Sequence, residues 1–186
     1  MEVASDLTLL ALISAGAAFA TLLRAFTGFG FALLAVPVFS VLLAPTQVVV
    51  LTSALALVLG VLSVRGWRGF LDTQEVVLLL VPAAVGTAIG AAVLPFLSVR
   101  HFQLGAGIAV LLSCATLLVN RVREPHTNSA VTGGVGLLSG LMNGALAIPG
   151  PPMIAYALLT KSDAQESRAL LIAFFFVSVF FALATF

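Results

Sequence analysis

The sequence predicts an all-α polytopic membrane protein, folded as an inverted-repeat helical bundle with two broken, re-entrant helical hairpins. The first observation is composition, because hydrophobic residues make up 61% of the chain and charged residues only 8%. A soluble domain usually carries about 25% charged residues, so lipid must surround much of this surface. The second is a series of apolar stretches long enough to cross a bilayer. The third is a pair of short stretches that follow helix-breaking residues.

Eight apolar stretches follow one another along the 186 residues. A membrane-spanning helix needs about 20 apolar residues, so six stretches are expected to cross and two are too short. One short stretch, 29–44, is entered through the sequence TGFG, and the other, 151–160, through PGPP. Irregular backbone is tolerated at membrane depth only where it lines a protein cavity, so we expect the two breaks to meet near the midplane. The long stretches are 7–26, 46–64, 75–98, 102–120, 130–148 and 168–186.

The first stretch is predicted to be a membrane helix rather than a signal peptide, because its flank carries Glu2 and Asp6 in place of a basic region. Positive charges then give the orientation, since short loops rich in Lys and Arg stay in the cytoplasm. Alternate connections hold six such residues, whereas the opposite side holds only Arg100. We therefore expect a multi-pass protein of the cell inner membrane with a periplasmic N-terminus. The six residues are Arg65, Arg68, Arg121, Arg123, Lys161 and Arg168.

A repeated layout divides the chain into two parts. Residues 1–125 are predicted to form a first repeat of about five apolar helices, and 126–186 the start of a second repeat with about three. Segments 18–64 and 137–186 each contain a helix, a Gly-rich break, a short helix with proline, a polar turn and a long apolar helix. The copies start about five spans apart, and an odd number inverts the second one. The second copy is expected to be incomplete, with roughly two further spans to follow by the length rule.

Arg24 is the charge that lies deepest in an apolar stretch, one turn before the first break. An arginine at bilayer depth costs about 2.5–3.5 kcal/mol on insertion scales and usually faces a cavity or a partner. Two interpretations remain open. Arg24 is either an anion ligand or a side chain that snorkels to the cytoplasmic interface.

The two breaks supply further candidate ligands. Thr27 is expected to cap a helix that starts at Gly28, and Pro151 to take the first position of the second short helix. Helix N-termini present free N–H groups and a partial positive charge, so they attract anions. Two such ends beside Arg24 would hold a small oxyanion, whereas the alternative is a pair of plain surface loops. The candidate substrate-binding residues are Arg24, Thr27, Gly28, Gly30, Asn143, Gly144, Gly150 and Pro151.

Other polar and small residues have structural interpretations beside the functional one. The Asn143 amide is expected either to bind substrate or to staple helices together. Ser53 is predicted to pack internally, and Arg168 to be a cytoplasmic loop charge or, alternatively, a functional residue. Glycines spaced four residues apart predict close helix packing. These glycines are Gly86 and Gly90, and Gly136, Gly140 and Gly144.

Several function classes are excluded by what the sequence lacks. It contains no nucleotide-binding fingerprint and no Ser-His-Asp spacing, so we expect no enzyme. Cys114 is the single cysteine, and His101 and His126 lie far apart, so we expect no metal site and no cofactor. No basic run exists that would track a nucleic acid. The expected partners are a small anion and the lipid bilayer, and the oligomeric state is left open, a homo-oligomer included.

The breaks and the residues around them resemble the sulfite exporter TauE/SafE family over nearly the whole chain. The resemblance implies a bacterial inner-membrane exporter of sulfite, an organosulfonate or another small anion. The chain departs from the family in the sequence AIPG at 147–150, where a run of glycines is usual. The matching residues are Thr27, Gly28, Phe29, Gly30, Pro37, Gly136, Asn143, Gly144, Ile148, Pro149, Gly150, Pro151, Pro152 and Arg168.

The sequence therefore predicts a secondary transporter of small anions, and the family resemblance implies that it works as an exporter. An anion channel of the same architecture is the first alternative. A non-transporting membrane scaffold or subunit is the second.

Overall fold

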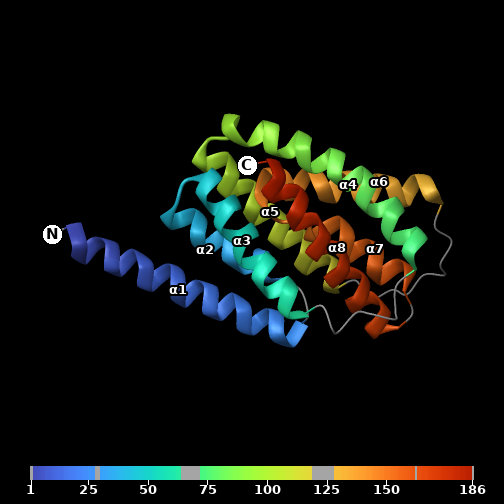
Figure 1. Ribbon diagram of the computed structural model, residues 1–186, viewed down its shortest axis with the longest axis horizontal. Helices are drawn as coiled ribbons and strands as arrows, with labels where there is room; N and C mark the ends of the chain where they lie inside the picture. The colour runs from blue at the N-terminus through green and yellow to red at the C-terminus, as the bar shows by residue number, and fades with distance from the viewer. Residues whose placement is uncertain (1, 28–29, 64–71, 119–127, 162, 186) are drawn as a thin grey trace.

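The structure is a computed structural model, and it describes residues 2–27, 30–63, 72–118, 128–161 and 163–185. Every regular element within these residues is helical, and the helices form one elongated bundle with α1 along its edge (Figure 1). The elements are α1 (Glu2–Thr27), α2 (Phe31–Leu42), α3 (Pro45–Ser63), α4 (Thr73–Val93), the short 3-10 helix η2 (Leu94–Phe96), α5 (Val99–Leu118), α6 (Ser129–Leu146), α7 (Gly150–Thr160) and α8 (Ala164–Thr185).

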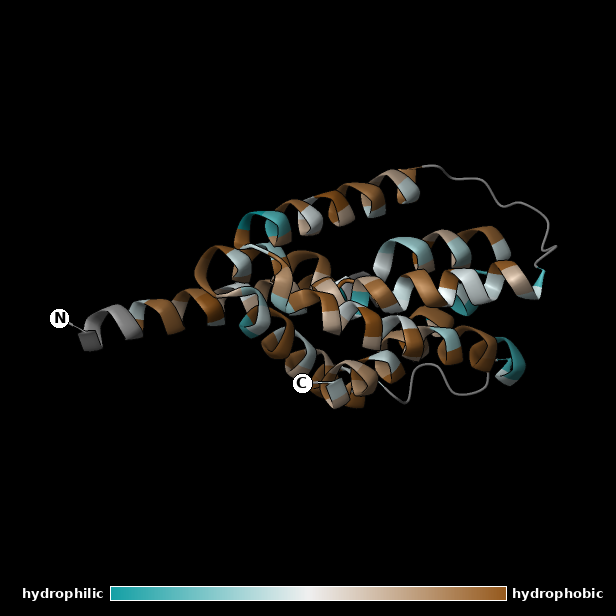
Figure 2. Cartoon of the chain, turned by 90° about the horizontal axis from the view of Figure 1, so that it is seen from above, coloured by the Kyte–Doolittle hydropathy of each residue, from teal (hydrophilic) through white to brown (hydrophobic). Residues whose placement is uncertain are grey.

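Five helices in the described chain are long and apolar enough to cross a membrane, which confirms a multi-pass helical protein. They are α1, α3, α4 with η2, α5 and α8. Large apolar side chains such as Leu62 and Phe96, exposed by 77% and 88%, need lipid around them. Figure 2 shows such hydrophobic residues along the length of the helices. The sixth expected span, α6, has 18 residues but is not among the five, because small residues make up much of its length.

Glycines bring α4 and α6 into backbone contact. A Cβ atom at Gly140 would overlap the carbonyl oxygen of Ala83, and one at Gly144 would overlap that of Thr87. Glycines on α4 meet the backbone of α6 in the same way, and the two helices lie side by side (Figure 1). The prediction of close helix packing is thus confirmed for the whole set, which is Gly86, Gly90, Gly136, Gly140 and Gly144.

The helices α2 and α7 are too short to cross alone. They contain 12 and 11 residues, or about 18 and 16 Å at 1.5 Å per residue, against a hydrocarbon thickness of about 30 Å. Each follows a residue with positive φ, Gly30 at 94° and Ala147 at 56°, and no other described residue has one. A left-handed residue stops the preceding helical path and redirects the chain, so both predicted breaks are real interruptions.

The predicted start of the first short helix was wrong. The helix α1 continues through Thr27, and α2 begins only at Phe31 with Gly30 as its N-cap and no side-chain cap. The reason is the left-handed backbone of Gly30, which cannot belong to a right-handed helix. Gly28 and the side chain of Thr27 lie outside the described residues.

In the described chain, α1–α5 lie before residue 119 and α6–α8 after residue 127. The predicted division into repeats at residue 125 stays a prediction. The helices that lead into the two breaks, α1 and α6, run in opposite directions (Figure 1). The inverted-repeat relationship itself stays a prediction. The orientation in the membrane also stays a prediction, because Arg65, Arg68, Arg121 and Arg123 lie outside the described residues.

Candidate functional site

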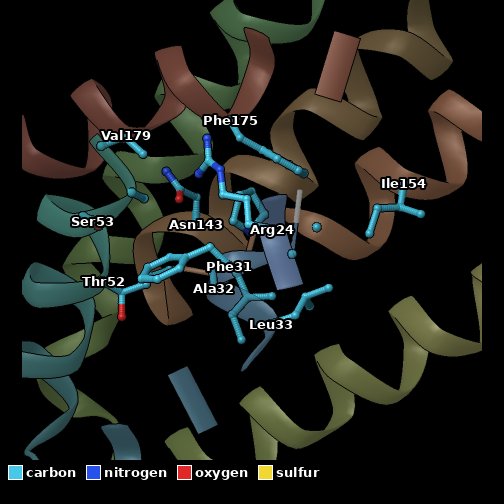
Figure 3. A pocket seen from close by; sticks show the side chains of 16 residues that line it. Arg24, Phe31, Ala32, Leu33, Thr52, Ser53, Asn143, Ile154, Phe175 and Val179 are labelled. Atoms are coloured by element: carbon cyan, nitrogen blue, oxygen red, sulfur yellow. The ribbon is translucent and has the colours of Figure 1, made fainter. Parts of the chain in front are cut away.

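The two breaks line one cavity inside the bundle. Its volume is about 50 Å³, and a single water needs about 10–15 Å³ on this measure. The cavity therefore has room for a few waters or one small oxyanion. Its walls come from the end of α1, both breaks and α2, α3, α6, α7 and α8 (Figure 3). We call it the central cavity.

Arg24 lies in the last turn of α1, and its side chain lines the central cavity. The side chain is partly buried, and no described residue forms a hydrogen bond or ion pair with it. A guanidinium group carries five N–H donors and keeps its charge. An anion in the cavity would meet those donors.

The N-terminus of α2 faces the same cavity. Gly30, Phe31, Ala32 and Leu33 all line it, and these are the N-cap and first three residues of the helix. Their backbone N–H groups have no partner within the helix, and the helix dipole adds a partial positive charge at this end. The first break thus supplies a set of adjacent backbone donors.

The N-terminus of α7 supplies the dipole but few donors. Pro149, the N-cap, and Gly150, the first residue, both line the central cavity. Pro151 is buried as the second residue of the helix and does not line the cavity, so its predicted first position was off by one. Proline has no N–H, and Pro152 follows, so Gly150 carries the single N–H of this first turn. Direct hydrogen bonds to an anion would therefore come mainly from α2.

Ala147 ends α6 in a left-handed conformation, with φ 56° and ψ 24°. An L-residue pays about 1–2 kcal/mol for this conformation, whereas glycine adopts it freely. The position falls in the segment where the family resemblance leads one to expect glycines. Ala147 lines the central cavity. The surrounding structure therefore keeps the second break in this conformation although the left-handed backbone of Ala147 is unfavourable.

Asn143 joins three helices at the wall of the cavity. Its Nδ2 donates to the carbonyl oxygen of Ser178 on α8 at 2.9 Å and to Oγ1 of Thr87 on α4 at 3.5 Å. The side chain therefore acts as a staple, and its role as a substrate ligand stays a prediction. The neighbouring Gly144 packs on α4 and does not line the cavity.

Sequence reasoning missed Thr52 as a cavity residue and assigned Ser53 to packing alone. Both lie on α3 and line the central cavity, exposed by 1% and 3%. The Thr52 hydroxyl is buried without a hydrogen-bond partner among the described residues, although a buried polar group left unpaired costs about 1–3 kcal/mol. The available signal was a pair of hydroxyl residues in the middle of an apolar stretch.

The structure thus brings four predicted site residues to one cavity, namely Arg24, Gly30, Asn143 and Gly150. Their role in binding stays a prediction. A family model described as sulfite exporter TauE/SafE matches residues 12–186 and so includes Arg24 and both breaks. No curated protein and no solved structure matches the chain. Because the match covers most of the sequence, the chain belongs to the sulfite exporter TauE/SafE family of membrane transporters.

Proposed function

We propose that the chain is a secondary transporter that exports a small oxyanion, sulfite or an organosulfonate, across the bacterial inner membrane. The anion would sit in the central cavity. The observation that carries this proposal is the convergence of Arg24 and the N-termini of α2 and α7 on one buried space.

The charge balance of the central cavity favours an anion. Arg24 brings a full positive charge and the two helix ends bring partial ones, while no carboxylate is among the described lining residues. Much of the remaining wall is apolar, including Phe31, Ile154 and Phe175. Electrostatic attraction is stronger in such surroundings than in water.

The hydrogen-bond donors also suit an oxyanion. Its oxygens would accept from the Arg24 guanidinium and from the free N–H groups at the start of α2. The Thr52 hydroxyl, whose oxygen is directed away from Arg24 in Figure 3, would donate after its side chain rotates about χ1. Backbone donors at a helix N-terminus are a common anion-binding arrangement. Sulfite and sulfonates each present three oxygens, so they match a cavity whose donors come from several sides.

The breaks also provide hinges for transport. In secondary transporters, interrupted helices meet near the bilayer midplane and surround the substrate. Hinges are a few residues at element ends that absorb changes in φ and ψ. Gly30 and Ala147 occupy such places, one at each break. We propose that α2 and α7 tilt about them to open the cavity to alternate sides.

The test is sulfite flux into liposomes that contain the purified full chain. We expect saturable flux that Arg24→Ala abolishes. Arg100→Ala is the matched control, because Arg100 is an exposed residue at the start of α5, away from the cavity. Flux that survives Arg24→Ala would contradict the proposed site. Single-channel currents would show that the protein is an anion channel rather than a transporter. The absence of any sulfite flux would favour a non-transporting scaffold.

A further inference from the structure

A second, wider cavity adjoins the first at one end of the bundle. Its volume is about 590 Å³, and it lies where α1 and α3 end and α8 begins. Three of its polar lining residues are Arg24, Gln165 and Arg168. We call it the vestibule. Arg24 lines both spaces, so it stands at their junction.

Two helices run continuously from the central cavity to the vestibule. On α3, Thr52 and Ala56 line the central cavity, and Leu59 and Ser63 line the vestibule. Steps of four, three and four residues keep these positions on one face of a helix. The vestibule and the central cavity are therefore successive parts of one path along α3.

The same pattern holds on α8. Arg168 and Ile172 line the vestibule, and Phe175 and Val179 line the central cavity. The steps are again four, three and four residues, so a single face of α8, which packs beside α3, lines the same two spaces. Beside the two arginines, the vestibule lining also includes apolar residues such as Leu59, Ala169 and Ile172.

Within the described chain, the two arginines of this path have no carboxylate partner. Arg168 is exposed and Arg24 is partly buried, and neither forms an ion pair within the described chain, where Lys161 and Glu75 make the salt bridge. No carboxylate is among the described residues that line the vestibule. A cleft lined by one sign of charge concentrates ions of the opposite sign.

We propose that the vestibule is a second anion site, in which Arg168 captures the oxyanion from water and delivers it to Arg24. This inference rests on the proposed function and adds the route by which the substrate reaches the central cavity. With the predicted orientation, the vestibule opens to the cytoplasm, where an exporter takes up its substrate. The phosphate of an anionic lipid offers the same chemistry, so the test distinguishes the two sources.

The first arm of the test measures the local potential without transport. Gln165→Cys in a Cys114→Ser background places one thiol in the vestibule, because Cys114 is the only natural cysteine. We compare alkylation by iodoacetate, which is negative, with alkylation by neutral iodoacetamide. Arg168→Ala should lower the rate ratio about fivefold at low salt, while Arg168→Lys and Arg100→Ala should leave it nearly unchanged. An unchanged ratio in Arg168→Ala would overturn the capture site.

The second arm measures sulfite flux in vesicles of neutral lipid. Arg168→Ala should raise KM about fivefold and leave the maximal rate intact, whereas Arg24→Ala abolishes flux. These two variants separate the two proposals. Normal flux in Arg24→Ala would refute the central site, whereas an unchanged KM in Arg168→Ala would refute only the vestibule. Vesicles that also contain an anionic lipid are the third arm. If the anionic lipid abolishes the effect of Arg168→Ala on both the alkylation rate ratio and the KM, a lipid headgroup occupies the vestibule and substrate capture is overturned.

Discussion

Replacing Thr52 by valine should make the protein more stable and a poorer transporter. The hydroxyl is buried at the wall of the central cavity without a partner in the described chain. Valine keeps a similar shape and removes the unpaired group, which relieves about 1–3 kcal/mol in the empty protein. If the hydroxyl donates to the bound anion, its loss removes a hydrogen bond to a charged group, which is about 1.5–3 kcal/mol. That loss corresponds to about tenfold weaker binding or more.

Ser139 provides the matched control. Its hydroxyl on α6 is also buried without a partner in the described chain, but it lines neither cavity. Ser139→Ala should therefore raise stability without changing transport. The assays are thermal unfolding in detergent and the sulfite concentration dependence of flux in liposomes. Equal transport in Thr52→Val and the natural protein would refute the role of this hydroxyl, and a fall in stability would refute its unpaired state.

Three further changes test the packing and the breaks. Gly140→Ala should destabilise the protein by about 1–3 kcal/mol, because its methyl group would meet the backbone of α4. The control Gly134→Ala, in open space on the same helix, should be neutral or stabilising in thermal unfolding. Ala147→Gly should stabilise by about 0.5–1 kcal/mol by relieving the left-handed alanine, whereas Ala145→Gly, inside the helix, should destabilise by about 1 kcal/mol. Ala32→Pro should weaken sulfite binding about tenfold by removing one N–H while α2 still forms, and unchanged binding would exclude that donor.

The sequence predicted the order of the α-helices in the described chain, because the bilayer sets the length of an apolar stretch that crosses it. Each of the eight apolar stretches became a helix, and the two shortest became α2 and α7. Glycine spacing predicted close helix packing but not its partner, and the structure shows that the two sets of glycines bring α4 and α6 together, an approach that only a residue without Cβ permits. The exact start of α2 was missed, since TGFG contains two glycines and the sequence does not show which one adopts positive φ.

The lining of the central cavity was harder to predict for a physical reason. In a soluble helix, polar residues mark the outer face, but in a membrane the lipid side and the protein side are both apolar. Thr52 and Ser53 on α3 therefore carried little directional information. Arg24 was identified because a charge at that depth is costly. Arg168, which lines the vestibule, kept two interpretations, because a charge near the end of a helix also has an ordinary surface explanation.

The most direct test of the central claim is to locate a bound oxyanion. Selenite is a heavier analogue of sulfite, and its selenium atom gives an anomalous X-ray signal. Crystals of the full chain grown with selenite should show one peak in the central cavity, within hydrogen-bonding distance of the Arg24 guanidinium and the first N–H groups of α2. A peak elsewhere with the cavity holding only water would contradict the account.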